Sequence, residues 1–369
     1  MPAYVAERGA LLKEFIQDKF LQIDKIEGIL GDAGLRSYSR IYSGGESYII
    51  MDCPPDYCSV QPFMDVAKYL AEQGFSVPKI IHHDVEHGFL ALEDFGSVSV
   101  KDYLLQNANP EEHKRIYHLI IDLLIDAQDK SDVGNAEIGK LVSGSVEPGK
   151  PGSGKPGSAS LGKSNPALDS CAANKSESTF GTFDNELLAS ELQIFIDYYI
   201  PYAYNRELSI GELEEFMEIW SNILASQDPM PDSFIFRDYH VENMMYLEHR
   251  DSIKKIGLLD FQDAFLGSPI YDLVSVLEDA RFNVPREDAL AYIGYFTQKK
   301  ELNLEHVLRN YHILGAQRNS RILGVFARKA SRDGDDSYIK YIPRVLQYLD
   351  YDLSHSSLVV LKAWLEKLK

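Results

Sequence analysis

Short runs of apolar, β-type residues dominate the first hundred residues of the chain. A helical pattern comes first, over residues 9–22. Behind it, the pair Gly44-Gly45 marks a hairpin turn between two of the β-type runs. We expect five strands, over residues 24–29, 35–42, 47–52, 77–82 and 88–93. These runs predict a small antiparallel sheet of ordinary size.

From Asn109 onward the apolar positions follow a helical period. Asn109-Pro110-Glu111-Glu112 combines an N-cap, a proline at the first helical position and acids in the first turn. Further helical patterns cover residues 184–199 and 208–225, and the chain after Tyr271 is again mostly helical. The fold class predicted is therefore α+β, with a β-rich N-terminal lobe over residues 1–93 and a helical C-terminal lobe over residues 94–369.

Residues 131–181 interrupt the second lobe with a low-complexity insertion. The pentapeptide at 149–153 recurs at 154–158, and Gly, Ser, Pro and Lys bury too little apolar surface to offset the entropy of ordering. Residues 157–164 match the phosphate-loop pattern G-x-x-x-x-G-K-[ST]. A genuine phosphate loop opens a helix, which Asn165-Pro166 would interrupt. We interpret the segment as a flexible insertion and the match as a product of composition.

Composition and charge limit the possible partners. The chain has 369 residues, 45% of them hydrophobic, and a net charge of −19. This composition is typical of a globular protein, and the acidity argues against nucleic acid or an anionic membrane as a partner. No apolar run is long enough to span a bilayer, and the first residues lack a signal-peptide pattern. We expect a cytoplasmic protein, monomeric by default.

The three cysteines, Cys53, Cys58 and Cys171, form an odd set. No second pair completes a metal site or a disulfide framework. The cysteine content therefore predicts neither, which fits a reducing cytoplasm.

Residues 233–263 carry the strongest chemical signal. Two short apolar runs flank a polar loop in which Asp238 is followed five positions later by Asn243, and a third apolar run ends at Asp260. Phosphoryl transfer requires a carboxylate beside the acceptor hydroxyl, and a carboxylate and an amide that hold Mg²⁺ across the nucleotide phosphates. Taken singly, these residues could be turn or cap residues. As an ordered set they predict Asp238 as the base and Asn243 and Asp260 as the metal ligands.

This block resembles the catalytic loop of the aminoglycoside phosphotransferase-like kinases, which are two-lobed relatives of the protein kinases. Residues 260–264 and 267–275 resemble the family's metal-binding segment and the helix that follows it. The resemblance implies a protein-kinase-like fold with ATP and Mg²⁺ as cofactors. It also implies that Asp272, within Tyr271-Asp272-Leu273, braces the catalytic loop.

Further stretches narrow the resemblance to the bacterial anomeric kinases of N-acetylmuramate and N-acetylglucosamine. They lie at residues 34–40, 51–55, 88–96 and 314–334, and the similarity spans nearly the whole chain except residues 131–181. This resemblance implies a small-molecule sugar as substrate, phosphorylation of its anomeric hydroxyl and a role in cell-wall sugar recycling.

The nucleotide-contacting residues depart from the general kinase pattern. Phe236 stands where a histidine is usual, and strand 47–52 has no lysine to pair with phosphates. We expect Arg36 or Arg40 to replace that lysine, because a guanidinium can bind phosphate bidentately. Glu93 is predicted to lie at the hinge between the lobes, where backbone groups meet adenine; a plain strand end is the alternative.

A basic segment breaks the acidity of the chain between Glu305 and Asp333. Four of its arginines recur at helical spacings of 3, 7 and 4, namely Arg318, Arg321, Arg328 and Arg332. Either Arg318 and Arg321 contact an anionic group, such as the lactyl carboxylate of N-acetylmuramate or the nucleotide phosphates, or these arginines form salt bridges to the acidic remainder of the lobe.

Two other functions remain open at this point. One is a kinase of the same fold acting on an aminoglycoside, choline or homoserine, although the basic segment weighs against a polycationic aminoglycoside. The other is a non-catalytic kinase-like binding module, which Phe236 and the missing strand lysine would suit.

Overall fold

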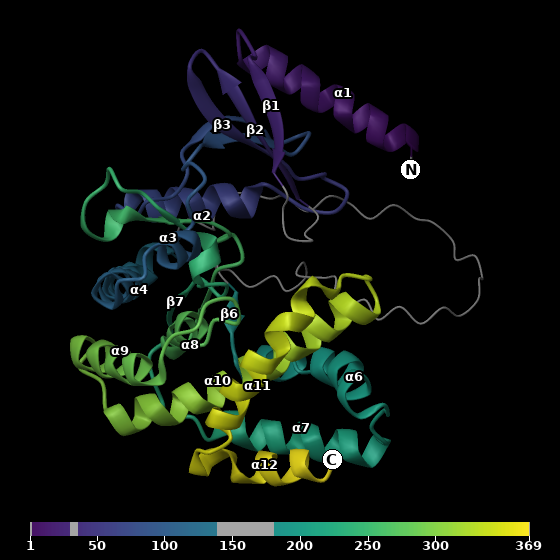
Figure 1. The fold of residues 1–369 in the computed structure, drawn as a ribbon, viewed down its shortest axis with the longest axis vertical. Coiled ribbons are helices and arrows are strands. Elements are labelled where there is room, and N and C mark those ends of the chain that lie inside the picture. The colour runs from purple at the N-terminus through teal and green to yellow at the C-terminus, as the bar shows by residue number, and fades with distance from the viewer. Residues whose placement is uncertain (1, 30–35, 139–180, 369) are drawn as a thin grey trace.

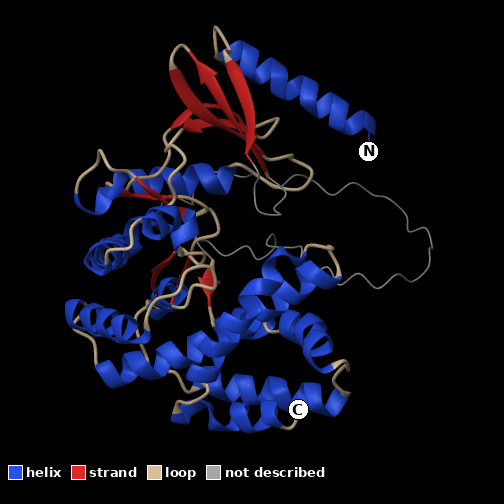
Figure 2. Ribbon diagram, viewed as in Figure 1, coloured by secondary structure: helices blue, strands red, loops and turns tan. Residues whose placement is uncertain are grey.

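The β-sheet lies at one end of the molecule and the helices form the rest (Figures 1 and 2). A computed structural model describes residues 2–29, 36–138 and 181–368. Five antiparallel strands are hydrogen-bonded in the order β1-β2-β3-β5-β4. They are β1 (Lys25–Ile29), β2 (Ser37–Ser43), β3 (Glu46–Asp52), β4 (Ile80–Asp84) and β5 (Phe89–Glu93). The predicted sheet is confirmed, although β4 begins at Ile80 and not at residue 77.

Two helices pack on this sheet. Helix α1 (Pro2–Lys19) buries Phe15 and Ile16 against Ile41 and Ile50 of the strands. Helix α2 (Gln61–Glu72), which we did not predict, buries its apolar side in the main core, with Phe63, Val66, Ala67 and Leu70 at helical spacing.

The chain after the sheet is mainly helical, as the apolar period predicts. Its α-helices are α3 (Val100–Gln106), α4 (Pro110–Ile138), α5 (Asn185–Ser190), α6 (Ile200–Tyr204), α7 (Ile210–Ala225), α8 (Ile270–Leu277), α9 (Arg286–Lys299), α10 (Leu304–Ser331), α11 (Ile342–Asp352) and α12 (Val359–Glu366). The single helix predicted over residues 184–199 is instead α5 followed by a π-helical turn, η1 (Phe195–Tyr199), which packs on α10.

Short strands and 3₁₀ turns complete this part of the chain. The strands are β6 (Thr182–Phe183), β7 (Ser233–Ile235), β8 (Met244–Tyr246), β9 (Ile256–Leu258) and β10 (Phe265–Gly267). The turns are η2 (Val241–Asn243), η3 (Ser252–Lys255), η4 (Asp336–Tyr341) and η5 (Ser356–Leu358). Strands β7, β8 and β9 confirm the three apolar runs predicted around the polar loop.

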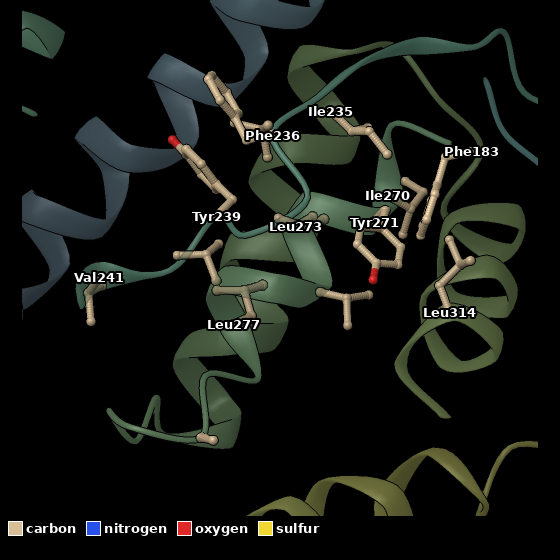
Figure 3. Close-up of a cluster of buried hydrophobic side chains, with 14 of the residues drawn as sticks. Phe183, Ile235, Phe236, Tyr239, Val241, Ile270, Tyr271, Leu273, Leu277 and Leu314 are labelled. Atoms are coloured by element: carbon tan, nitrogen blue, oxygen red, sulfur yellow. The ribbon is translucent and has the colours of Figure 1, made fainter. Parts of the chain in front are cut away.

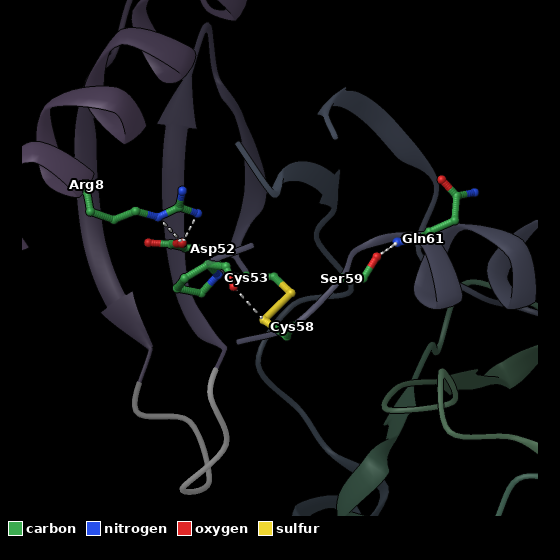
Figure 4. The surroundings of a disulfide bond; sticks show 7 residues. Arg8, Asp52, Cys53, Cys58, Ser59 and Gln61 are labelled. Carbon is green, nitrogen blue, oxygen red and sulfur yellow. Dashed lines mark hydrogen bonds and ion pairs between the residues drawn. A yellow bond between two sulfur atoms is a disulfide. The ribbon is translucent and has the colours of Figure 1, made fainter. Parts of the chain in front are cut away.

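Cys53 and Cys58 are joined by a disulfide bond between β3 and α2 (Figure 4). The prediction that these cysteines form no disulfide is wrong. A turn after β3 brings them together, since Tyr57 and Cys58 both donate their backbone N–H to the carbonyl of Pro54, at 2.9 and 3.0 Å. The Cα atoms of the pair are 5.8 Å apart, within the range that a disulfide spans.

Helix α4 continues to Ile138, beyond the predicted start of the insertion at residue 131. The remainder of that segment, including the phosphate-loop-like residues 157–164, lies outside the described residues. Within the described ranges, no helix is both long and apolar enough to cross a membrane.

Candidate active site

The catalytic loop connects β7 to β8, and β9 pairs with β8 beside it. Because Met244 lies opposite Leu258 in this antiparallel pair, Asn243 and Asp260 meet just beyond the ends of the strands. The Asn243 Nδ2 atom lies 3.5 Å from the Asp260 Oδ2 atom and 3.1 Å from the carbonyl oxygen of Asp238. The structure thus brings together the three residues that the spacing predicted as base and metal ligands.

Aromatic packing supports the catalytic loop (Figure 3). Phe236, at the position of the usual histidine, is buried and stacks on Tyr239 with ring centroids 4.9 Å apart. The Tyr239 hydroxyl donates a hydrogen bond of 2.7 Å to the carbonyl of Ile120 in α4. In this chain, packing and one hydroxyl anchor the loop where a histidine hydrogen bond is expected from the family.

Asp272 of α8 braces the loop as the resemblance implied. Its carboxylate accepts hydrogen bonds from the backbone N–H groups of Phe236, at 2.5 Å, and Arg237, at 2.9 Å. Burial raises the pKa of Asp272 to about 7, although these two donors favour the ionised form.

Positive charges surround Asp238. Withdrawal from water would raise the pKa of Asp238, but the charges of Arg321 and Arg237 outweigh that effect and hold this pKa below its ordinary value. Asp238 is therefore ionised at neutral pH, as a group that accepts a proton must be.

Asp260 has the opposite environment. Burial in the cleft is the main cause that raises the pKa of Asp260, and the negative charges of Asp238 and Asp263 add to it. A hydrogen bond of 2.7 Å from Gln262 to Asp260 Oδ1 offsets part of this rise. Crowded carboxylates of this kind suit a site that a divalent cation would neutralise.

A cavity of about 810 Å³ lies between the sheet and the helical part of the chain. Ile49, Leu92 and Met245 contribute apolar walls, and residues 93–97, from the last residue of β5 onward, form one edge. Asn243 and Asp260 line the same cavity. An apolar pocket with a few polar groups at one end is typical of a cofactor or ligand site.

The three residues predicted to contact the nucleotide all line this cavity, but their side chains differ in the hydrogen bonds that they already form. Arg40 forms a bidentate pair with Asp94, at 2.6 and 3.0 Å, and also donates to the carbonyl of Gly96. The Glu93 side chain pairs with Arg250 at 2.7 Å. In contrast, the buried Nε atom of Arg36 has no hydrogen-bond partner among the residues that the structure describes. Arg36 is thus the more available of the two predicted phosphate cations.

Arg318 and Arg321 lie on α10 near Asp238, and they also differ. Arg321 Nε is 3.2 Å from Glu191 Oε2, and Glu191 in addition pairs with Arg237. Arg318 is 4% exposed, and its Nη1 atom has no hydrogen-bond partner. The salt-bridge alternative thus describes Arg321, whereas Arg318 forms no ion pair within the described ranges.

Two acidic residues that organise the site were not predicted. Glu191 joins Arg237 to Arg321, and no motif in the sequence marks it. Glu242, within the catalytic loop, pairs with Lys101 and, at 2.5 Å, with Arg281. Its place four positions after Asp238 is the only sequence signal for it.

Comparison with known proteins assigns the chain to a family. The model of the phosphotransferase enzyme family matches residues 25–305. The chain belongs to this family. As a family member it is a phosphotransferase, and the prediction of a phosphoryl-transferring enzyme is confirmed.

Curated relatives of this phosphotransferase cover nearly its whole length. The N-acetylmuramate/N-acetylglucosamine kinase of Caulobacter vibrioides is 30% identical, over 98% of this chain and 97% of the relative. A protein of the same name from Neisseria meningitidis is 29% identical, over 93% and 90% of the two chains.

Solved structures confirm the protein-kinase-like fold. The choline kinase LicA of Streptococcus pneumoniae has a TM-score of 0.58 with 13% identity, covering 94% of this chain and 99% of that one. The ADP-bound aminoglycoside phosphotransferase APH(2'')-Ib has a TM-score of 0.54 with 13% identity, covering 92% and 97%. At this identity the likeness concerns the fold alone.

Proposed function

We propose that this phosphotransferase transfers the γ-phosphoryl group of ATP to the anomeric hydroxyl of N-acetylmuramate or N-acetylglucosamine. The observation that carries the proposal is that Asn243 contacts both Asp238 and Asp260, while Asn243 and Asp260 line the cavity between the sheet and the helices. The names of the curated relatives support the choice of sugar.

The nucleotide would occupy the apolar part of the cavity. A volume of about 810 Å³ suits a ligand of this size, and Ile49, Leu92 and Met245 can enclose a purine ring. The boundary between the lobes after Glu93 would place backbone groups beside adenine. Arg36 would contact the phosphates, because its Nε atom is unpartnered while Arg40 is held by Asp94.

Mg²⁺ fits the residues at the polar end. Asn243 donates through Nδ2, which leaves its Oδ1 atom available, and Asp260 adds a carboxylate whose raised pKa a cation would lower. Oxygen ligands from one or two side chains, completed by phosphates and water, are what Mg²⁺ takes in such sites. When bound, the ion would neutralise charge on the transferring phosphoryl group.

Asp238 would orient the acceptor and take its proton. The anomeric oxygen then forms a bond to the γ-phosphorus as the bond from that phosphorus to the bridging oxygen of ADP breaks. Arg237 and Arg321 keep Asp238 ionised, and Arg318 and Arg321 contribute the positive surroundings of the substrate. The products are a sugar 1-phosphate and ADP. Every group named belongs to one chain, so a monomer would suffice. The cytoplasm would supply the ATP.

A substrate panel tests the proposal. The chain is incubated with ATP, Mg²⁺ and each acceptor in turn: the two amino sugars, an aminoglycoside, choline and homoserine. ³¹P NMR should show an acid-labile phosphate coupled to an anomeric proton with the amino sugars. Phosphorylation of choline, homoserine or the aminoglycoside alone would overturn the choice of acceptor, and no ATP consumption with any acceptor would favour a binding module.

A further inference from the structure

Arg318 is a buried cation with an unsatisfied nitrogen atom. The side chain lies in the middle of α10 and is 4% exposed. Its Nη1 atom forms no hydrogen bond, and within the described part of the chain the guanidinium has no ion pair. A buried charge is strongly unfavourable unless it is paired and hydrogen-bonded. Arg318 is therefore a position where acceptor atoms from a ligand would be stabilising.

The other cations around the reacting centre already have carboxylate partners. Arg237 and Arg321 share Glu191, and Arg281 pairs with Glu242. Among the arginines near Asp238, and within the described ranges, Arg318 is the one that forms no ion pair with a carboxylate of the chain.

Arg318 also lies close to the reacting centre. Its charge acts on both Asp238 and Asp272, which places the guanidinium near the catalytic loop. Val325 and Lys329 of the same helix line the cavity. They follow Arg318 by seven and eleven positions, so all three lie on one face of α10. On that face, Arg318 lies about two to three helical turns from the residues that reach the cavity.

We infer that Arg318 binds a carboxylate of the acceptor sugar and thereby makes an acidic amino sugar the preferred ligand. The inference rests on the proposed function and deepens it, because N-acetylmuramate carries a lactyl carboxylate that N-acetylglucosamine lacks. A guanidinium pairs with a carboxylate through two parallel hydrogen bonds, a geometry that an ammonium cannot reproduce. The nucleotide phosphates are the weaker candidate, since Arg36, Asn243 and Asp260 already define their end of the site.

Calorimetric binding of both sugars to the full chain, without nucleotide, tests this inference. The wild-type chain should bind N-acetylmuramate about tenfold more tightly than N-acetylglucosamine. Arg318→Gln should weaken N-acetylmuramate binding by about tenfold to a hundredfold and change N-acetylglucosamine binding by less than about threefold. Arg318→Lys should restore part of the loss. The matched control is Arg332→Gln, an exposed arginine at the end of α10 that pairs with Asp333 and should change neither affinity.

A change to the sugar gives a readout that does not depend on how the variants fold. The methyl ester of N-acetylmuramate should bind the wild-type chain no more tightly than N-acetylglucosamine does. Equal affinity of the wild-type chain for the acid and its ester, or an equal loss of both sugars in Arg318→Gln, would overturn the assignment. Binding needs no turnover, so the two proposals can fail separately. If the binding preference depends on Arg318 but no sugar phosphate forms, only the proposed function is refuted. If sugar phosphate forms but the wild-type chain binds both sugars with equal affinity, only this inference is refuted.

Discussion

Two residues beside the reacting centre, Arg237 and Asp260, have a left-handed backbone, with φ of 70° and 56°. This conformation costs a non-glycine residue about 1–3 kcal/mol and persists only where the surroundings impose it. Asp272 holds the N–H of Arg237, Glu191 holds its guanidinium, and Gln262 holds the carboxylate of Asp260. The strained backbone therefore occurs at Arg237, which directly precedes Asp238, and at Asp260, which is itself a predicted metal ligand.

Asp272 should make stability depend on pH. Its pKa is raised to about 7 from an ordinary value of 3.8, so between these values the folded chain holds a proton that the unfolded chain releases. The contribution of Asp272 to the free energy of unfolding therefore falls as pH rises toward about 7 and is constant above it. Urea unfolding of the wild type and Asp272→Asn should be measured from about pH 5 to about pH 8. The free energy of unfolding of the wild type relative to that of the variant should fall as pH rises to about 7 and then stay constant. A difference that does not vary with pH would contradict this assignment.

Replacing Arg36 should affect the nucleotide and not the sugar. Arg36→Gln removes from the cavity wall a guanidinium whose Nε atom has no partner among the described residues, and we expect the KM for ATP to rise about tenfold, the usual effect of losing one charge-assisted hydrogen bond. Steady-state kinetics with each substrate varied in turn measures this, with Arg332→Gln as the matched surface control. A rise confined to the KM of the sugar would instead place Arg36 in the acceptor site.

Among the elements, α10 connects most parts of the helical lobe. Close approach to its neighbours depends on two glycines. A Cβ atom on Gly315 would lie 2.6 Å from an oxygen of Asp352 in α11, and one on Gly324 would lie 2.5 Å from the backbone carbon of Ile194 beside η1. These contacts fix the face that carries Arg318 and Arg321 relative to the catalytic loop.

Gly324→Ala should therefore destabilise the fold. The new methyl group would meet backbone atoms, which cannot move aside as a side chain end can, so we expect a loss of about 2 kcal/mol or more in the free energy of unfolding. Gly294→Ala in α9 is the matched control, because its Cβ would have no atom within 4 Å, and it should be neutral or stabilising by up to about 1 kcal/mol. Equal melting temperatures for the two variants would show that α10 does not approach η1 this closely.

Local periodicity predicted most elements, but their long-range pairing could not be predicted. The five strands of the sheet and the strands around Asp238 follow from apolar runs and turn residues that are neighbours in sequence. Helix α2 was not predicted, although Phe63, Val66 and Leu70 have helical spacing, because it is a short helix between β-type runs. The Arg40–Asp94 pair and the contact of Glu191 with Arg237 join residues far apart in the chain, and no local pattern encodes them.

At the scale of the molecule, the net charge of −19 coexists with a cluster of arginines around one aspartate. The net acidity argues against nucleic acid as a partner, while the arginines around Asp238 would suit a reaction of anionic groups. The two-lobed fold was predictable because the resemblance extends over nearly the whole chain. The sequence could not predict that Arg321 pairs with Glu191 while Arg318 forms no ion pair among the described residues, because this depends on tertiary packing.

Removing residues 142–178 should leave the enzyme intact. Their composition predicts a passive insertion, and no residue assigned to the site falls within them. A variant joining the flanking chain through a short Gly/Ser linker should keep its kcat, KM values and melting temperature. Loss of activity in a folded variant would show that the insertion contributes to the site.

The most direct test of phosphoryl transfer at this site is Asp238→Asn, measured by sugar phosphate formation and by ADP binding in parallel. Removing the carboxylate that accepts the proton should lower kcat by about a hundredfold to ten-thousandfold, while ADP binds as to the wild type because the cavity walls are unchanged. Asp350→Asn, a change on the exposed side of α11, is the control and should be fully active. Wild-type turnover in Asp238→Asn would contradict the account.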